Sequence, residues 1–597
     1  MEQTQETVAE VIRRQENDYI NGKITLGKYV DHSMYETIET ILAYLNSKHT
    51  AGLYDSQNRE KPFFNICTAI RNIWYRATDL DRKNLRIKAT KATYQEWLKA
   101  FWATAELKEW MRRERFGTFL NDWGRTLADY GTAVPKFVEQ KGKLVPSVVP
   151  WNRLIVDAVE FDPNPKIEVL YLTASQLRQN ELYDQDMVEK LIETRAARET
   201  AGKQKKDNKA DYIKLYEIHG ELPLSYLTGK EKDETEYRQQ MHVISFVVAK
   251  EKGKFDDFSL YKGKEKEDPY MITHLIKEDG RTLGIGAVEH AFEAQWMTND
   301  SARAIKNHLD IASKLIFQTS DGTFIGRNVL TTIEQGDIMI HKPNQPLTQI
   351  NNGSHDITSL LSFSQQWQNL AKEITSTPEA IRGDTMPSGT AWRQVEALRM
   401  ESHSLFEIMR ENKGLHVEDM LRTYVIPYLK KEIKKKHSIV AELDKESADM
   451  IDEQYINMMV KEQIDNIEAR GQFVDPVQVQ QEMESAREKL RRLGGLREQK
   501  ITEDLFKDYE WEIEFDITDE AIDKEAVLTT LNTVFTSIAS NPMILQDPNA
   551  RMLFNRILEE TGVVSPVEFQ AAPTASQMVQ PQPALSQPNG GSPSVPA

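Results

Sequence analysis

Residues 284–322 of the chain read GIGAVEHAFEAQWMTNDSARAIKNHLDIASKLIFQTSDG, and this stretch is the most informative part of the sequence. One set of its residues recurs at steps of three and four, or at their sum, which is typical of one face of an amphipathic helix. The set comprises Val288, Phe292, Gln295, Ala302, Ile305, Leu309, Ala312 and Ile316. Residues 359–375, SLLSFSQQWQNLAKEIT, repeat the pattern with Leu360, Phe363, Trp367, Leu370 and Ile374. The sequence therefore predicts a hairpin of two amphipathic helices.

The segment between the two predicted helices contains several Gly and Pro residues and predicts short β-strands. The expected strands are Thr323–Ile325, Ile338–Ile340 and Leu347–Ile350. Beyond the second helix, residues 376–391 read STPEAIRGDTMPSGTA and precede a long third helix. Pro disfavours helix at the residue before it and Gly permits unusual turns, so this loop can hinge between the flanking helices.

The rest of the chain predicts an α+β fold that is mainly helical. Trp residues at helical spacing between residues 93 and 131 favour a packed core over a platform for stacking bases. Residues 211–219 and 241–250 are rich in β-branched residues and predict strands, as does WEIEFDIT at 511–518. From residue 569 onwards there is no charged residue, and Pro, Gln, Ser and Ala dominate, which predicts a disordered tail.

Composition limits the class of protein. The chain has 597 residues, enough for several domains, and a formal net charge of −17. This charge argues against a protein that grips nucleic acid over its whole surface, but it fits one that DNA passes without being held. The sequence has no apolar run long enough for a transmembrane helix and no apolar signal-peptide core, so we expect a cytosolic protein without a membrane association.

The sequence shows no motif for catalysis, a cofactor or a metal. It lacks a phosphate-binding P-loop, the HExxH zinc motif and the GxSxG nucleophile elbow. Its single cysteine, Cys67, lies in an apolar run and excludes intramolecular disulfides, and we interpret it as a buried core thiol. The basic run KKEIKKK at residues 430–436 could contact phosphates, but we favour a cation-rich helix C-terminus that complements the helix dipole.

Four segments, in this order along the chain, resemble the portal protein, or head–tail connector, of tailed bacteriophages, particularly of the short-tailed kind. Residues 58–77 (NREKPFFNICTAIRNIWYRA) resemble the helix that opens the portal wing, and residues 127–157 resemble the wing's turn and strand pair. Residues 283–314 resemble the Gly-x-Gly entry into the first stem helix, with its Gln295 and Asn299. Residues 388–429 resemble the loop and long helix after the second stem helix, and the collinear order carries the resemblance.

The resemblance implies a portal fold that assembles into a ring, most often a dodecamer. The implied segments are an N-terminal wing (1–283), a first stem helix (284–318), a small β-containing clip (319–352), a second stem helix (353–375), a tunnel loop (376–390), a long helix with the rest of the wing (391–540), a crown (541–568) and a disordered Pro/Gln-rich tail (569–597).

The resemblance also implies a structural, non-enzymatic role at one vertex of the capsid. A portal ring forms the channel for packaging, retention and ejection of double-stranded DNA, and it sits between head and tail in the virion after assembly in the host cytoplasm. The implied partners are other copies of this chain, the large terminase subunit that hydrolyses ATP, the major capsid and scaffold proteins, and a head–tail adaptor. No cofactor and no metal are implied.

The portal resemblance also implies which residues belong to the functional sites. Cations in or beside the tunnel loop are expected to touch DNA transiently, and the loop residues of interest are Arg382, Asp384, Ser388 and Arg393. In the clip, short strands need partners from neighbouring subunits, because a lone hairpin is marginal in water; the residues concerned are Phe324, Ile325, Ile338, Met339 and Ile340. Packing of the stem is assigned to Phe292, Ile305, Leu309, Phe363, Trp367 and Leu370.

Two other classes of protein share this composition. A large helical scaffold or adaptor without a channel would bind its partners through charged helices and would not require a clip between two amphipathic helices. An enzyme with an unrecognised site would require a concave cluster of titratable groups with shifted pKa values.

Overall fold

In the computed structural model, the chain divides into two compact units, Met1–Ile517 and Thr518–Ala597. The second unit lies outside the residues that the structure describes, so every element named below belongs to the first unit. The structure describes residues 6–515 except 27, 29–30, 55–57, 81–84, 89–93, 201–211, 231–232, 250–254, 313–316, 319, 321–341, 346–347, 350–356, 377–391, 437, 443–450, 454, 458, 462–463, 465–475, 493–495, 501–505, 507–508 and 510.

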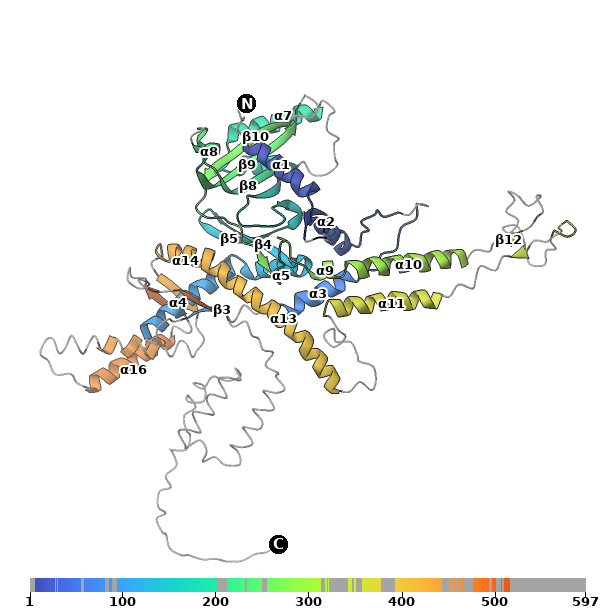
Figure 1. Cartoon of the computed structure of the whole chain (residues 1–597). Coiled ribbons are helices and arrows are strands. Elements are labelled where there is room, and N and C mark those ends of the chain that lie inside the picture. Colours follow the sequence, from blue (N-terminus) through green and yellow to red (C-terminus); the bar gives the residue numbers. More distant parts are fainter. Residues whose placement is uncertain are drawn as a thin grey trace, which may run out of the picture. The chain divides into compact units, whose positions relative to one another are not determined.

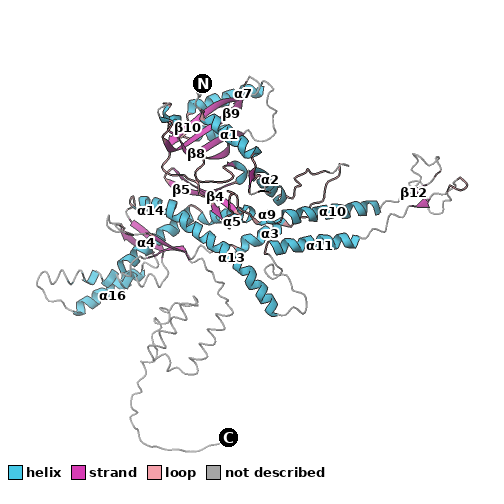
Figure 2. Ribbon diagram, viewed as in Figure 1, coloured by secondary structure: helices cyan, strands magenta, loops and turns pink. Residues whose placement is uncertain are grey.

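The described residues form a mixed structure of helices and strands in which helix predominates, as the sequence predicts (Figures 1 and 2). The main helices are α1 (Val8–Asn21), α2 (Met34–Leu45), α3 (Cys67–Ala77), α4 (Tyr94–Arg113), α5 (Phe116–Tyr130), α6 (Ala174–Gln179), α7 (Gln185–Thr200), α8 (Ser225–Thr228), α9 (Ala287–His290), α10 (Phe292–Ala312), α11 (Ile357–Ile374), α13 (Trp392–Met420), α14 (Ile426–Ile433) and α16 (Pro476–Arg492).

A five-stranded antiparallel sheet has the order β10-β9-β8-β7-β6. Its strands are β6 (Leu154–Ile155), β7 (Lys166–Thr173), β8 (Tyr212–Pro223), β9 (Tyr237–Val248) and β10 (Phe255–Lys264). Ile12 of α1 packs in one cluster with Ile218, and Val188 of α7 packs in another with Leu215. Because apolar side chains are covered on both faces, β8 and β9 carry long buried runs instead of a strict alternation.

A second sheet has the order β11-β4-β5, with β4 at Thr132–Gln140, β5 at Lys143–Val149 and β11 at Thr273–His274. It belongs to the largest hydrophobic core, together with helices that include α3, α5 and α13. Trp102, Trp110 and Trp123 are each 1% exposed, which confirms that these tryptophans form core and not a stacking platform.

Four short strand pairs complete the described residues. β1 (Ile24–Thr25) pairs with β2 (Asp31–His32). β3 (Leu85–Lys88) pairs with β16 (Glu512–Phe515), which is the strand expected in WEIEFDIT. β14 (Ser438–Glu442) pairs with β15 (Leu496–Lys500). β12 (Phe317–Gln318) pairs with β13 (Thr348–Gln349).

Candidate functional site: a helical hairpin and its joint

The predicted helical hairpin is present: α10 and α11 contact each other along their length and lie side by side in Figures 1 and 2. At their far end Phe317 pairs with Gln349 and Gln318 with Thr348, so a two-stranded ladder joins the chain leaving α10 to the chain approaching α11. Arg393 lies in the first turn of α13. The other residues assigned to the clip and the tunnel loop lie outside the described residues: Phe324, Ile325, Ile338, Met339, Ile340, Arg382, Asp384 and Ser388.

The six residues expected to pack the stem have different environments within one chain. Phe292 and Trp367 pack against the main core, and Phe292 makes an edge-to-face contact with Tyr44 at 5.5 Å. Ile305 is half-buried. Leu309, Phe363 and Leu370 are exposed, Leu309 by 51%. The buried residues of α11 are the small Ser364 and Ala371. The large apolar residues Phe363 and Leu370 stay exposed in the single chain.

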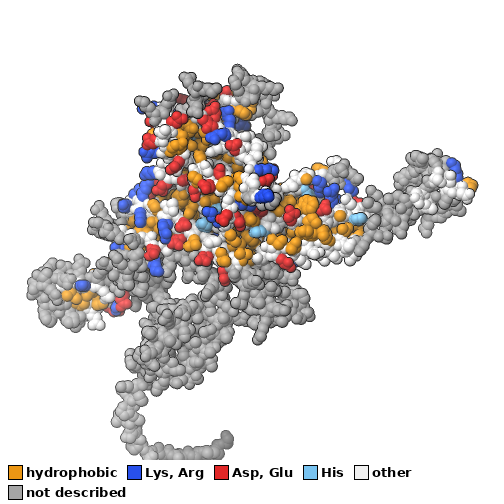
Figure 3. Space-filling model, in the orientation of Figure 1, with side chains coloured by type: hydrophobic (Ala, Val, Ile, Leu, Met, Phe, Trp, Pro, Cys, Tyr) orange, Lys and Arg blue, Asp and Glu red, His pale blue; other side chains and the backbone are white. Residues whose placement is uncertain are grey.

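Exposed apolar side chains of α11 form a stripe. Phe363, Leu370 and Ile374 lie on one face of the helix and are 37–50% exposed, and Figure 3 shows apolar side chains gathered over the hairpin. Singly exposed apolar residues are common on monomeric proteins, whereas several on one face of a helix form a larger apolar surface. We call these three residues the α11 stripe.

The base of the hairpin is fixed by a side chain that caps another helix. The N-cap residue of α3, Ile66, makes no side-chain cap. Instead Gln295 of α10 accepts hydrogen bonds from the backbone N–H groups of Ile66 at 2.9 Å and Cys67 at 3.2 Å. Its amide nitrogen donates to the carbonyl of Phe64 at 2.7 Å, and the side-chain oxygen of Asn299 accepts from the backbone N–H of Phe64 at 2.9 Å. The Gln and Asn singled out by the resemblance therefore hold α10 to α3.

The opposite end of α3 is held by α13. The Arg410 guanidinium donates to the carbonyl of Ala77 at 2.8 Å, and the buried Lys413 ammonium donates to the carbonyl of Thr78. Cations at a helix C-terminus satisfy its free carbonyls and oppose its dipole. From the side of α3, the Trp74 indole N–H donates to the carbonyl of Thr375, just after α11, at 2.9 Å. Helix α3 thus contacts α10, the residue that follows α11, and α13. Helices α10 and α11 form the hairpin, and α13 is the next described helix in the sequence.

Glycines allow two backbone segments to cross where the chain enters the hairpin. Gly131 ends α5 with a φ of 71°, and a Cβ there would lie 2.6 Å from the carbonyl carbon of Ile285. A Cβ on Gly286 would lie 2.4 Å from the carbonyl oxygen of Asp129. The backbone N–H of Gly284 donates to the Thr132 hydroxyl at 2.6 Å. Because no side chain fits in this crossing, packing requires the Gly-x-Gly of the sequence.

The segment between α2 and α3 runs along the outside of α10. Arg59 donates to Asp310 at 3.2 Å and to Asn307 at 3.1 Å, and Lys306 donates to the carbonyl of Glu60 at 3.1 Å. The contacts lie about three to four turns beyond Gln295, so this segment supports α10 well away from its base.

A buried ionic cluster links the two sheets. The Lys136 ammonium of β4 lies 2.6 Å from a carboxylate oxygen of Glu168 on β7, and it also contacts Glu217 on β8. The Tyr270 hydroxyl donates to Glu168 at 3.0 Å. Burial opposes the charge of Lys136, yet the two carboxylates outweigh it and raise the pKa of Lys136. Because every charge has a partner, the cluster fits a structural joint between sheets.

His219 extends this cluster. Its two ring nitrogens each lie 2.8 Å from a carboxylate, Nε2 from Glu217 and Nδ1 from Glu265. Burial opposes the positive charge, but the hydrogen bonds to Glu217 and Glu265 outweigh it and raise the pKa of His219 to about 9. An imidazolium with both N–H groups engaged has no free nitrogen to take a proton from a substrate. His219 is therefore not placed as a general base.

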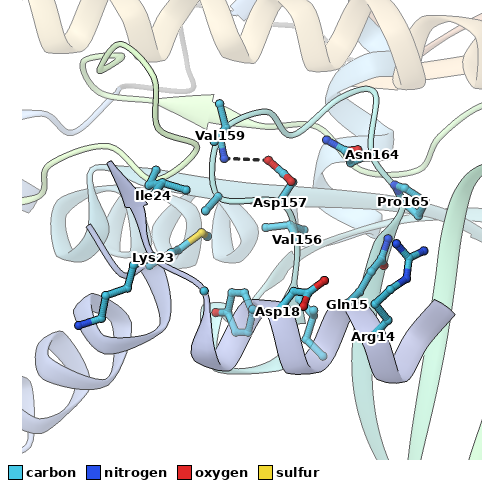
Figure 4. A pocket seen from close by; sticks show the side chains of 15 residues that line it. Arg14, Gln15, Asp18, Lys23, Ile24, Val156, Asp157, Val159, Asn164 and Pro165 are labelled. Atoms are coloured by element: carbon cyan, nitrogen blue, oxygen red, sulfur yellow. Dashed lines mark hydrogen bonds between the residues drawn. The ribbon is translucent and has the colours of Figure 1, made fainter. Parts of the chain in front are cut away.

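A cavity of about 310 Å³ lies between α1 and the chain around residues 155–165 (Figure 4). Its charged lining has both signs, with Arg14 and Lys23 beside Asp18 and Asp157. The Asp157 carboxylate already accepts hydrogen bonds from the backbone N–H groups of Val159 at 2.8 Å and Glu160 at 3.0 Å. Asp157 thus stabilises a local turn. The charged lining of the cavity favours neither an anionic nor a cationic ligand.

Among the described residues, no group of three or more His, Cys, Asp or Glu side chains is placed to hold a metal ion. Cys67 is buried, and burial raises the pKa of its thiol to about 12. None of the described helices combines the length and the apolar character that crossing a membrane needs. In comparisons with known proteins, no family model and no curated protein matches the sequence.

Proposed function

We propose that this chain is the subunit of a portal ring at one capsid vertex, through which double-stranded DNA is packaged, retained and ejected. The observation that carries the proposal is the α11 stripe on a helical hairpin whose base is fixed by α3 and whose far end holds a short strand pair. A hairpin of this kind leaves apolar surface for a neighbouring copy. Its small distal ladder likewise gains stability when strands of other copies extend it.

In the proposed ring the hairpins of successive subunits stand side by side around the channel. The α11 stripe packs against the next copy, so the contact is heterologous and closes by rotation. A chain with a net charge of −17 repels the phosphate backbone at long range, which keeps the duplex moving through the channel. The strand pair at the tip, with the segment between its strands, docks the terminase motor and later the tail adaptor.

Residues 376–390 take the place of the tunnel loop in this proposal, because they follow α11 and precede α13 in the sequence. The loop cation Arg382, with Arg393 at the start of α13, contacts the passing phosphates. The chain acts as structure and not as an enzyme, and ATP hydrolysis belongs to the terminase.

The first test is negative-stain electron microscopy and native mass spectrometry of the purified full chain, alone and with capsid and scaffold proteins. Rings with a central hole and a mass near that of a dodecamer are expected. The double variant Phe363→Ser/Leu370→Ser is expected to fold but to give no rings, because it removes two of the three apolar side chains of the α11 stripe. The matched control is Leu182→Ser, an exposed leucine (66%) on a different part of the chain, which is expected to assemble normally.

A chain that stays monomeric even with capsid and scaffold proteins overturns the portal proposal and favours a scaffold or adaptor without a channel. Two substitutions separate assembly from DNA handling. Ile338→Pro is expected to abolish ring formation or motor docking. Arg382→Ala is expected to leave rings intact and to lower the packaging rate or the retention of packaged DNA, and unchanged packaging and retention would remove Arg382 from the DNA contact.

A further inference from the structure

Three segments that are far apart in the sequence meet at one end of the body, by which we mean the described residues outside the α10–α11 hairpin. The Arg113 guanidinium at the end of α4 donates to the Tyr428 hydroxyl of α14 at 3.3 Å. The same hydroxyl donates to the carbonyl of Gly142, in the turn between β4 and β5, at 3.0 Å. Lys431 of α14 bonds Glu139 of β4 at 3.0 Å. These contacts fix the end of α4, the β4–β5 turn and α14 next to each other.

Each of the three segments presents exposed cations. Figure 3 shows Lys and Arg side chains gathered on this side of the body, near α14, α4 and β5 of Figure 1. We call the exposed cations of these segments the basic surface: Arg112, Arg113, Arg115, Lys141, Lys143, Lys430, Lys431, Lys434 and Lys435. The run KKEIKKK supplies only four of the nine, so the surface is assembled by the fold.

Three of the four carboxylates that pair with cations here are largely shielded from solvent, and the fourth, Glu139 beside Lys431, is 44% exposed. The Glu114 side chain, which pairs with Arg113, is 8% exposed, and Glu106, which pairs with Lys436, is 4% exposed. Glu432 pairs with Lys435 and is 21% exposed. Among the described residues no carboxylate pairs with Arg112, Arg115, Lys141, Lys143 or Lys434. Most of the acidic side chains that pair with this surface are therefore shielded, while the Lys and Arg side chains are exposed to solvent.

Two of the cations occupy backbone positions that favour other residues. Lys141 and Gly142 have φ values of 50° and 76°, and they form the two-residue turn between β4 and β5. Hairpin turns with two positive φ values favour Asn-Gly, because a left-handed conformation is unfavourable for a residue such as Lys. Arg115 has a φ of 54°. Turn and helix-end geometry therefore does not account for Lys141 and Arg115.

The side chains around the cations decide which polyanion fits. None of the large apolar residues that are exposed in the described part of the chain belongs to the end of α4, the β4–β5 turn or α14. Protein interfaces have apolar and aromatic centres and are depleted in Lys. Single-stranded nucleic acid needs exposed aromatic rings for stacking, but Trp511, beneath Lys430, is 7% exposed. A surface of exposed Lys and Arg without apolar groups fits the phosphate backbone of a duplex.

We infer that the basic surface binds the phosphate backbone of double-stranded nucleic acid without reading its sequence. The site lies on the body and not on the helical hairpin, and the inference does not depend on the ring proposed above. Binding is local, because the rest of the chain is acidic, and it weakens steeply with salt as counterions are released from the duplex.

The test is fluorescence anisotropy of the full-length protein with a labelled random-sequence duplex of about 30 base pairs, titrated from about 25 to 200 mM NaCl, the range over which phosphate contacts weaken strongly. The basic-surface variant is Lys141→Asn/Lys143→Ser/Lys434→Ser, in which Asn suits the positive φ of the turn. The control variant Lys190→Ser/Lys230→Ser/Lys264→Ser makes the same change in net charge at exposed lysines elsewhere. Native mass and thermal unfolding of each protein establish equal assembly and folding.

The basic-surface variant is expected to bind at least about tenfold more weakly at low salt, and the slope of log K against log [NaCl] is expected to fall by about 2–3 because each lost phosphate contact contributes about 0.9. The control is expected to match the unmodified chain. Equal weakening in both variants, or unchanged binding in the basic-surface variant, overturns the inference. So does polyglutamate that binds as tightly as the duplex and depends on the same three lysines, because the surface would then recognise acidic protein segments. A protein that forms no rings even with capsid and scaffold proteins but shows the expected binding would refute the portal proposal and leave this inference standing.

Discussion

The side-chain oxygen of Gln295 accepts a hydrogen bond from the backbone N–H of Ile66 at 2.9 Å, so a residue of α10 closes the N-terminus of α3. The bond is fully buried, since Gln295 is 0% exposed. A helix N-terminus leaves N–H groups without partners inside the helix, and here the hairpin supplies the acceptor. The position of α10 along its own axis is therefore fixed by the start of α3.

Replacing Gln295 with Leu is expected to destabilise the chain by about 2–4 kcal/mol, because it leaves buried N–H groups of Ile66 and Cys67 and the carbonyl of Phe64 without partners. The measurement is the free energy of unfolding in denaturant. The control is Gln365→Leu, at an exposed position of α11, which is expected to change stability by less than about 0.5 kcal/mol. Equal effects of the two substitutions would show that Gln295 fills space and does not cap α3.

Gly131→Ala and Gly229→Ala separate backbone strain from steric collision. Both glycines end a helix with nearly the same positive φ, 71° after α5 and 69° after α8. A Cβ at Gly229 would meet nothing within 4 Å, whereas one at Gly131 would lie 2.6 Å from the backbone of Ile285. We expect about 1–2 kcal/mol of destabilisation for Gly229→Ala from left-handed strain alone, and a clearly larger loss or failure to fold for Gly131→Ala. Similar unfolding midpoints for the two variants would contradict the close crossing at Gly131.

Periodicity predicted which residues of the hairpin share a helix face, but not what covers that face. Phe363 and Leu370 lie on the predicted stripe of α11, yet the single chain leaves them exposed and buries Ser364 and Ala371. Gln295 falls on the predicted stripe of α10 as the only polar member, and its role as a cap depends on Ile66, 229 positions away. Sequence spacing carries no information on such a partner.

Buried charges were also beyond sequence patterns. Lys136 and Glu217 lie in strands, and the alternation of residues does not show whether their side chains face solvent or core. Their pairing depends on the contact between two sheets. By contrast, the strands β8 and β9 were predictable, because β-branched runs specify extended chain before any tertiary contact forms. The basic surface needed the fold, since only the fold brings Arg112, Lys141 and Lys434 to one side.

Lys413 is expected to make the chain less stable at neutral pH than at high pH. Burial lowers its pKa from 10.5 to about 8, although Asp79 nearby acts in the opposite direction. The folded state therefore holds the charged form poorly, and stability rises as pH increases from about 8 to 10.5. Relative to Lys413→Met, the unmodified chain is expected to gain about 3 kcal/mol over this range. The measurement is the difference in unfolding free energy at each pH. Lys190→Met, at an exposed site, serves as the control, and a flat difference for Lys413→Met would exclude a lowered pKa.

His219 is expected to have the opposite dependence on pH. Its pKa is raised from 6.5 to about 9 in the folded chain, because the hydrogen bonds to Glu217 and Glu265 outweigh burial. A group whose pKa is raised by folding stabilises fully below its unfolded pKa, so its contribution is complete below about pH 6.5 and is lost as pH rises through 9. The size of the shift corresponds to about 3 kcal/mol.

The check is the difference in unfolding free energy between the unmodified chain and His219→Gln at a series of pH values. The unmodified chain is expected to be more stable at pH 6, and the difference is expected to shrink steadily up to about pH 9.5 as the imidazolium loses its proton. His242→Gln is the matched control, because burial lowers the pKa of this neighbouring histidine to about 4. His242 is then neutral in both the folded and the unfolded chain above pH 7, so its difference should stay constant there. A constant difference for His219→Gln as well would mean that His219 is neutral in the fold and that Lys136 alone balances Glu217.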